Sequence, residues 1–213
     1  MKTDELISLL ANAETAVDRH ALARRFAAAL LGGGLAGLLL VMVVYGVRAD
    51  LAEVAATPLF WAKLALPGSL APLALWLSTR LARPGVAGGA AWVALGLPLL
   101  LVWLGGALAL VGVPVDARVD MVLGRTWRTC ALNIGLLSIP TFIGVFWAVR
   151  GLAPTRLRQA GAAAGLLAGA TATVAYSLHC PEMEVPFWGV WYVLGMLVPT
   201  LLGAALGPKL LRW

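Results

Sequence analysis

The chain has 213 residues, of which 61% are hydrophobic and 12% are charged. A soluble domain carries about 25% charged residues, so this composition excludes an ordinary soluble globular protein. The formal net charge is +6. The basic residues stand in short segments between long apolar runs, which favours a lipid bilayer over nucleic acid as the partner of that charge. Direct nucleic-acid binding is therefore not expected.

Residues 1–25 form the one sizeable polar segment, and they are predicted to begin with an amphipathic helix. Thr3 is a suitable N-cap, and Asp4 and Glu5 stand in the first turn, where the helix dipole favours acids. Apolar residues then recur at helical spacing on one face: Leu6, Leu10, Ala13 and Val17. A surface-seeking helix is usually rich in Lys and Arg, whereas this one opens with acids. Binding to a basic groove of a soluble protein is therefore favoured over binding to the membrane surface.

Six apolar segments follow, each with the composition of a transmembrane helix. Such a helix needs about 20 apolar residues to cross a hydrocarbon core of about 30 Å. The predicted spans are residues 26–47, 59–81, 87–111, 129–149, 157–178 and 187–206. The first run is too long for the apolar region of a signal peptide, so we expect no cleavage there. The sequence predicts an all-α membrane protein, with residues 1–25 as a cytoplasmic segment and residues 26–213 as a bundle of six transmembrane helices.

The distribution of Lys and Arg predicts the orientation. With the N-terminus inside, 11 basic residues are cytoplasmic and 5 are outside, as the positive-inside rule requires. Both termini are therefore expected in the cytoplasm. Lys63 lies near the outer end of the second span and is expected to snorkel to the surface. The outer set is Arg48, Lys63, Arg118, Arg125 and Arg128.

The interiors of the spans lack ionisable side chains, which ion-coupled transporters and proton pumps usually need at membrane depth. The sequence also contains no His-Glu-x-x-His, Gly-x-Ser-x-Gly or Walker motif. An enzyme is therefore not expected. A small transporter or channel for a neutral solute is the alternative to a regulatory protein.

Glycines at every fourth position form stripes along three of the spans. They stand at Gly33 and Gly37, at Gly161, Gly165 and Gly169, and at Gly203 and Gly207. Such stripes let helix backbones approach closely. Packing within one bundle is favoured over dimerisation, and the sequence does not define the oligomeric state.

Cys130 and Cys180 are the two cysteines, at the outer ends of the fourth and fifth spans. Helices joined by a short connection are usually neighbours, so the two thiols are expected at the same depth on the oxidising side, where disulfides persist. Three interpretations stay open: a static disulfide, a redox- or metal-responsive pair, and two unrelated free thiols.

The surroundings of Cys180 bear on the metal-responsive interpretation. His179, Glu182 and Glu184 stand beside this thiol and are candidate auxiliary ligands. Thiolates with a neighbouring imidazole suit a soft metal ion of the zinc or cadmium class. The spacing matches no standard zinc motif.

Several of these features together resemble the NrsF family of bacterial membrane anti-sigma factors. The resemblance covers nearly the whole chain. It rests on the opening MKTDELISLL, the six spans, the two outer cysteines, Trp191-Tyr192 and the C-terminal Leu211-Arg212-Trp213. It implies that the cytoplasmic N-terminus holds an extracytoplasmic-function sigma factor at the inner membrane. It also implies that Cys130 and Cys180 are needed to release that factor under heavy-metal or oxidative stress, with no constitutive cofactor.

On this interpretation the N-terminal helix buries apolar side chains in the sigma factor and pairs its acids with basic residues of the factor. The candidate contacts are Asp4, Glu5, Leu6, Ile7, Leu10, Glu14, Val17 and Asp18. Sigma factors need basic surfaces for promoter DNA, so an acidic helix competes for them.

Overall fold

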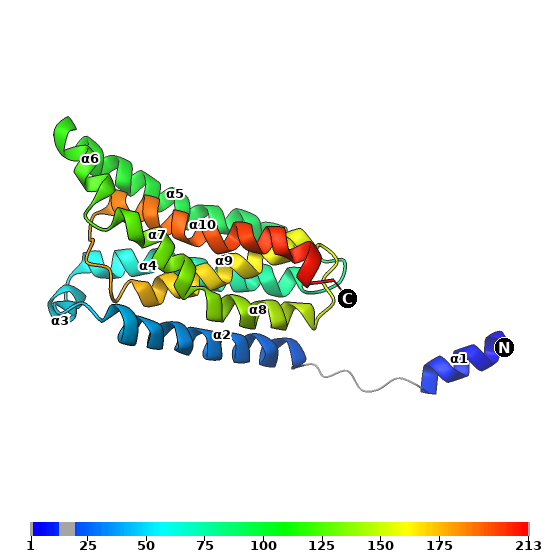
Figure 1. Cartoon of the computed structure of the whole chain (residues 1–213). Helices are drawn as coiled ribbons and strands as arrows, with labels where there is room; N and C mark the ends of the chain where they lie inside the picture. The colour runs from blue at the N-terminus through cyan, green and yellow to red at the C-terminus, as the bar shows by residue number, and fades with distance from the viewer. Residues whose placement is uncertain (1, 13–19, 213) are drawn as a thin grey trace.

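The computed structural model describes residues 2–12 and 20–212 of the chain. The regular structure of these residues is helical, and the long helices form one elongated bundle (Figure 1). In chain order the elements are α1 (Thr3–Asn12), α2 (Ala21–Leu40), the π-helical turn η1 (Val41–Tyr45), α3 (Leu51–Ala55), α4 (Pro58–Leu81), α5 (Ala90–Val111), α6 (Val115–Leu123), α7 (Trp127–Leu137), α8 (Ile139–Arg150), α9 (Leu157–Tyr176) and α10 (Val185–Leu210).

Five described helical segments are long and apolar enough to cross a membrane. They are α2 with η1, α4, α5, the run from Val115 to Arg150, and α10. These helices coincide with five of the six predicted spans and are compatible with crossing a membrane, with the predicted span 129–149 inside the longer run. The sixth, 157–178, corresponds to the 20-residue helix α9, which is not among the five. The sixth crossing of a membrane therefore stays a prediction.

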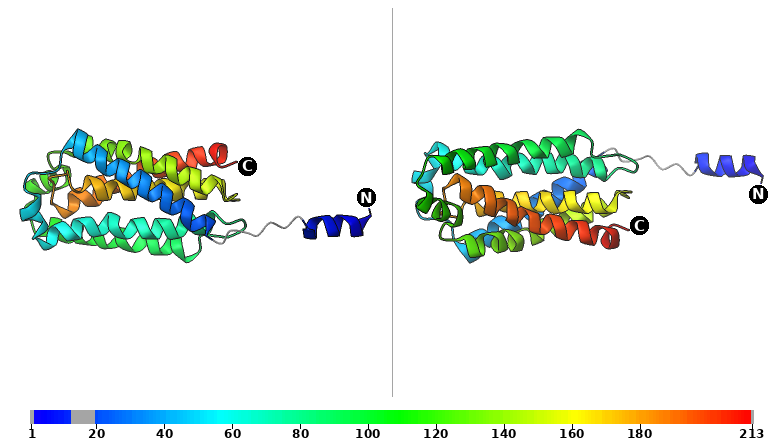
Figure 2. Two further views of the ribbon diagram at one scale, coloured as in Figure 1. Left: turned by 90° about the horizontal axis from the view of Figure 1, so that it is seen from below. Right: turned by 90° about the horizontal axis from the view of Figure 1, so that it is seen from above.

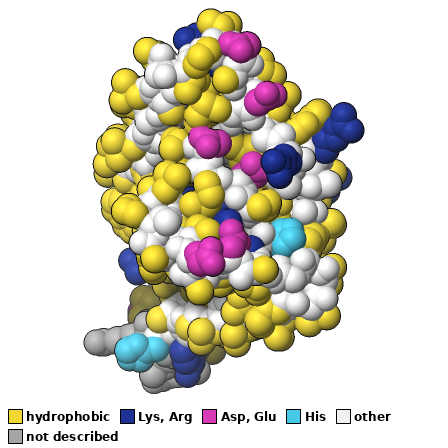
Figure 3. All heavy atoms as spheres, turned by 90° about the vertical axis from the view of Figure 1, so that its left-hand side faces the viewer, with side chains coloured by type: hydrophobic (Ala, Val, Ile, Leu, Met, Phe, Trp, Pro, Cys, Tyr) yellow, Lys and Arg dark blue, Asp and Glu magenta, His cyan; other side chains and the backbone are white. Residues whose placement is uncertain are grey.

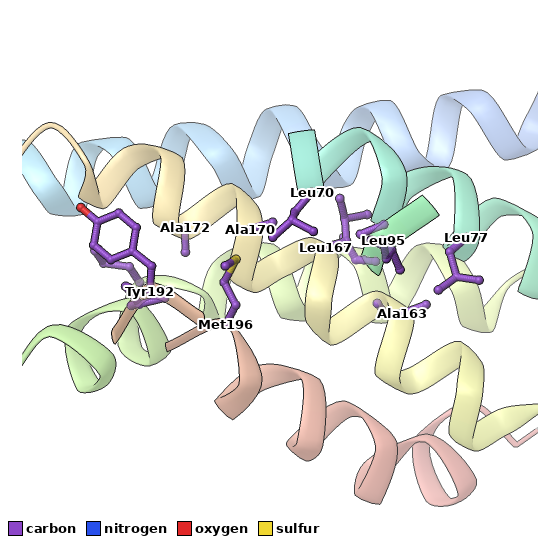
Figure 4. Close-up of a cluster of buried hydrophobic side chains, with 14 of the residues drawn as sticks. Leu70, Leu77, Leu95, Ala163, Leu167, Ala170, Ala172, Tyr192 and Met196 are labelled. Carbon is purple, nitrogen blue, oxygen red and sulfur yellow. The ribbon is translucent and has the colours of Figure 1, made fainter. Parts of the chain in front are cut away.

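Helix α9 differs from the others because it lies in the interior of the bundle. It packs against α10, α4, α8 and α7, and the two views in Figure 2 show the long helices side by side along the bundle. A helix surrounded by protein rather than lipid gains from small residues that let its neighbours approach. Its interior cluster is drawn in Figure 4, where these side chains gather: Leu70, Leu77, Leu95, Ala163, Leu167, Ala170 and Met196.

The glycine stripes mediate backbone contacts within the bundle, as predicted. A Cβ atom on Gly161 of α9 would collide with the carbonyl of Gly203 in α10, and one on Gly165 would collide with the carbonyl of Pro199. Gly33 of α2 meets the backbone of Thr141 in α8 in the same way. The seam between α9 and α10 is therefore closed by direct contact of main chains.

The two ends of the bundle are built differently. Helices α3 and α6 and the connection between α9 and α10 lie at one end, on the left in Figure 1. The start of α2 and the C-terminal end lie at the other. We call the first the cysteine end, defined by residues 46–57, 112–130 and 177–186. Figure 3 looks onto it and shows acidic and basic side chains and a histidine among hydrophobic ones.

Candidate functional site

The two cysteines meet at the cysteine end. Cys130 lies in the first turn of α7, and Cys180 lies in the connection between α9 and α10. Both side chains are fully buried and both are free thiols. The two thiols lie close enough to interact with each other. The structure thus brings the two cysteines together, one from α7 and one from the connection after α9, at the same end of the bundle as the sequence led us to expect. Their role as a sensor stays a prediction.

Two buried tyrosines line the thiol pair. The rings of Tyr176 and Tyr192 pack edge to face, with centroids 6.1 Å apart. Tyr176 interacts with the thiol of Cys130. The hydroxyl of Tyr192 lies near Cys180 and, among the described residues, has no hydrogen-bond partner of good geometry. Buried hydroxyl groups usually have a partner. The O–H group of Tyr192 is therefore available to donate a hydrogen bond to the sulfur of Cys180 when the chemistry of that sulfur changes.

Lys63 places a cation beside the pair, and its position corrects the sequence-based expectation. It is fully buried instead of reaching the surface. Its Nζ atom donates hydrogen bonds to the carbonyl oxygens of Cys180 at 2.7 Å and Glu182 at 2.8 Å. The ammonium group also lies 5.7 Å from the centre of the Tyr192 ring. The side chain points inward because the connection between α9 and α10 supplies acceptors that satisfy a desolvated charge.

Arg48 places a second cation on the same connection. Its Nη1 atom donates to the carbonyl oxygen of Cys180 at 3.2 Å and lies 3.5 Å from the sulfur of Met183. Its remaining donors bind the carboxylate of Asp50 at 2.7 and 2.8 Å. These hydrogen bonds hold the pKa of Asp50 below its usual value. Asp50 is therefore ionised at neutral pH and orients the guanidinium group toward the connection.

Glu182 links the connection to the start of α7. Its Oε1 atom accepts hydrogen bonds from the backbone N–H groups of Arg125 at 2.8 Å and Thr126 at 3.0 Å. These groups precede α7, whose N-terminus carries a partial positive charge. The carboxylate therefore ties the segment that carries Cys180 to the helix that carries Cys130.

The candidate metal ligands other than the thiols have different partners. The Nδ1 atom of His179 lies 2.8 Å from the carbonyl oxygen of Gly46, Glu182 binds the start of α7, and Glu184 is the residue before α10. Over the described parts of the chain, no group of three or more His, Cys, Asp or Glu side chains could hold a metal ion. Structural zinc sites have four ligands. The geometry therefore supports chemistry between two thiols better than a closed zinc site.

The predicted partner-binding residues fall in and beyond α1. The helix begins at Thr3 itself, and the carboxylate of Glu5 accepts a hydrogen bond from the backbone of Lys2 at 3.1 Å. Leu6 and Ile7 are 43% and 58% exposed. Asp4 and Leu10 belong to α1, whereas three further candidates lie outside the described residues: Glu14, Val17 and Asp18.

The bundle also contains an apolar groove between α4, α5, α9 and α10. Its volume is about 320 Å³, and its lining includes Leu70, Trp92, Leu95, Met196 and Thr200. Ionisable side chains are missing from this lining. The groove therefore offers little to a charged substrate.

The fold and the site define a class: a helical protein with several membrane-compatible helices whose distinctive chemistry is a buried pair of thiols. The chain belongs to the NrsF family, because the family model described as negative regulator of sigma F matches residues 10–213. This is a family of regulatory proteins, and the chain is not an enzyme.

Two relatives match over their full length. The chain is 44% identical over 213 residues to the probable anti-sigma-F factor NrsF of Azospira oryzae, with 100% of both chains covered. It is 37% identical over 220 residues to the anti-sigma-F factor NrsF of Caulobacter vibrioides, again with 100% of both covered. No solved structure matches the chain.

Proposed function

We propose that the chain is a membrane anti-sigma factor that holds a cytoplasmic extracytoplasmic-function sigma factor at the bacterial inner membrane. It binds the factor through residues 1–25 and releases it when Cys130 and Cys180 react under oxidative or heavy-metal stress. The observation that carries the proposal is the full-length similarity to two anti-sigma-F factors, at 44% and 37% identity.

The composition of α1 supports its role as the binding segment. Its first turn holds Asp4 and Glu5, and its apolar side chains Leu6 and Ile7 are exposed. A helix of this kind suits a groove in which apolar anchors are buried and acids meet basic residues. The excess of basic residues on the same side of the spans, 11 against 5, supports a cytoplasmic location for this helix.

The contact between the thiols supports their role as the sensor. A disulfide requires close Cα atoms and facing Cβ atoms, so two thiols that already interact need less backbone movement to form one than two distant thiols would. A soft metal ion of the zinc or cadmium class between the two thiolates is the other form of the proposal. It needs further ligands from a rearranged connection or from water. Either product adds a link between the start of α7 and the connection that follows α9. Helix α9 contacts α2, which follows the binding segment, so the proposed route from the thiols to that segment runs through these packed helices.

The experiment that tests the binding role replaces the apolar face of α1. In the full-length tagged protein, the double variant Leu6→Asp and Leu10→Asp loses co-purification of the sigma factor, and the genes that the factor controls are transcribed without stress. Ser8→Asp, on an exposed polar position of the same helix, is the matched control and retains the factor. Co-purification of the factor with the double variant would show that α1 is not the binding element.

A further inference from the structure

We propose that Lys63 is the positioning residue of the thiol pair. Its buried ammonium group holds the connection between α9 and α10 in the conformation that keeps Cys180 against Cys130, so that pairing of the two thiols depends on it. This inference rests on the proposed sensing role of the cysteines. It assigns a function to a residue on a third helix, α4.

Two hydrogen bonds from one nitrogen bracket the residue that carries the thiol. The Nζ atom donates to the carbonyl oxygen of Cys180 at 2.7 Å and to that of Glu182 at 2.8 Å. Charge-assisted bonds of this kind are roughly twice as strong as neutral ones. Because both acceptors are backbone atoms, the bonds restrain the chain on both sides of Pro181. They therefore restrain the direction in which the Cys180 side chain points.

The burial of Lys63 makes the restraint mutual. Among the described residues its polar partners are the two carbonyl groups, with the Tyr192 ring 5.7 Å away and no carboxylate at salt-bridge distance. A buried charge is costly unless its donors are satisfied. Movement of the connection away from α4 would leave the ammonium group unsatisfied, so Lys63 opposes separation of Cys180 from Cys130.

Arg48 reaches the same carbonyl oxygen of Cys180, at 3.2 Å, but it is bound on its other side to Asp50, which is exposed. Water can replace a partner at such an edge, whereas it reaches the fully buried Lys63 poorly. The conformation of the connection therefore depends more on Lys63 than on Arg48.

Pairing of the thiols is a two-electron oxidation, and the test uses the azo compound diamide as the oxidant. One cysteine, as thiolate, adds to the N=N bond, and the second sulfur then attacks the first and displaces the hydrazine nitrogen. Two S–H bonds break, one S–S bond forms, and the N=N bond takes up two electrons and two protons. In a cell a hydroperoxide accepts the same two electrons and is reduced to an alcohol and water.

The experiment measures the rate of this pairing in the full-length protein, reconstituted in lipid nanodiscs and treated with diamide. Samples are quenched with acid, and the remaining thiols are labelled with a maleimide-polyethylene glycol, which increases the mass of the protein. The chain has 2 cysteines, so a monomer that takes up no label has formed one bond between them. In Lys63→Met we expect pairing about ten-fold slower than in the unmodified protein, because effective concentration falls when the connection is not held. Lys63→Arg, which keeps cationic donors, is expected to restore most of the rate. Arg118→Met, at the same end but bonded to Val113, is the control and pairs at the normal rate.

A second readout separates positioning from a general loss of structure. Lys63→Met still co-purifies with the sigma factor before oxidation, and its reduced form sediments as the unmodified protein does. Slow pairing with this profile supports the inference, and pairing of Lys63→Met at the normal rate overturns it. If Lys63→Met does not accumulate, Lys63→Gln decides in the same way, because its shorter side chain does not span both carbonyl groups. If the unmodified protein pairs its thiols and keeps the factor bound, the proposed function fails while the positioning role stands.

Discussion

Helix α1 and the cysteine end carry the two halves of the proposed function, and they are built in opposite ways. In α1, apolar side chains are exposed, with Leu6 at 43% and Ile7 at 58%. At the cysteine end, a lysine and both thiols are fully buried. Apolar side chains left in water gain from a partner that covers them. A buried cluster whose charged donor is satisfied, as Lys63 is, instead holds one conformation until its chemistry changes. The difference supports the proposed division, with binding in the first region and sensing in the second.

The largest expected effect comes from disrupting the packing of α9 against α10 in the helical bundle, which connects the two regions. Gly161→Leu places a side chain against the carbonyl of Gly203, a backbone atom that cannot rotate away. We expect a loss of about 3 kcal/mol or more in the stability of the bundle. The protein accumulates poorly in the membrane fraction, and the sigma factor is no longer held. Gly32→Leu, where nothing lies within 4 Å of the added Cβ, is the control and accumulates normally. Normal accumulation of Gly161→Leu would mean that the seam between α9 and α10 is not closed as described.

An intermediate effect is expected from a change confined to the cysteine end. Glu182→Gln weakens the acceptor for the backbone N–H groups of Arg125 and Thr126, which costs about 1 kcal/mol. The start of α7 then opens more often. In a Cys180→Ser background, alkylation of Cys130 is expected to become about five-fold faster, while binding of the sigma factor is unchanged. Glu184→Gln, which makes no capping bond to α10, should leave the rate unaltered. An unchanged rate in Glu182→Gln would show that this carboxylate does not hold the two segments together.

The smallest effect is expected at the exposed edge of the same end. The hydrogen bonds with Arg48 lower the pKa of Asp50. Its contribution to the stability of the folded protein is therefore fully present above the ordinary pKa of an aspartate, and it is lost as the pH falls through the lowered value. Thermal unfolding of the unmodified protein and of Asp50→Asn should therefore differ slightly and by a constant amount above about pH 5. The difference should shrink only in stronger acid. A difference that changes between neutral pH and mildly acidic pH would contradict the assigned ion pair.

The sequence predicts those features of the molecule that follow from hydropathy, from residue spacing along a helix and from the adjacency of consecutive helices. Hydropathy located the long helices, and the spacing of Gly161, Gly165 and Gly169 located the seam with α10. The helix α9 fell below the hydropathy of a typical span because small residues serve packing inside the bundle, where lipid is absent. The meeting of Cys130 and Cys180 followed from the adjacency of consecutive helices.

The position of Lys63 was wrong in the sequence-based account because its acceptors come from a distant connection. Proximity to the membrane boundary predicted snorkelling, but the carbonyl groups of Cys180 and Glu182 satisfy the charge inside. The partners of Glu182 were missed for the same reason, because a carboxylate beside a thiol resembles a metal ligand in sequence while it binds the start of α7 in space. Tertiary hydrogen bonds of this kind have no periodic signal. Lys63, an ionisable residue near the end of an apolar run, is the signal in the sequence that could have indicated these contacts.

The measurement that tests the central claim most directly follows the sigma factor bound to the full-length protein before and after oxidant, with Cys130→Ser and Cys180→Ser beside the unmodified chain. We predict that the factor co-purifies with all three proteins under reducing conditions. After oxidation it leaves the unmodified protein, with formation of the Cys130–Cys180 bond, and stays on both variants. Release of the factor from both serine variants at the normal rate would contradict the assignment of these two thiols as the sensor.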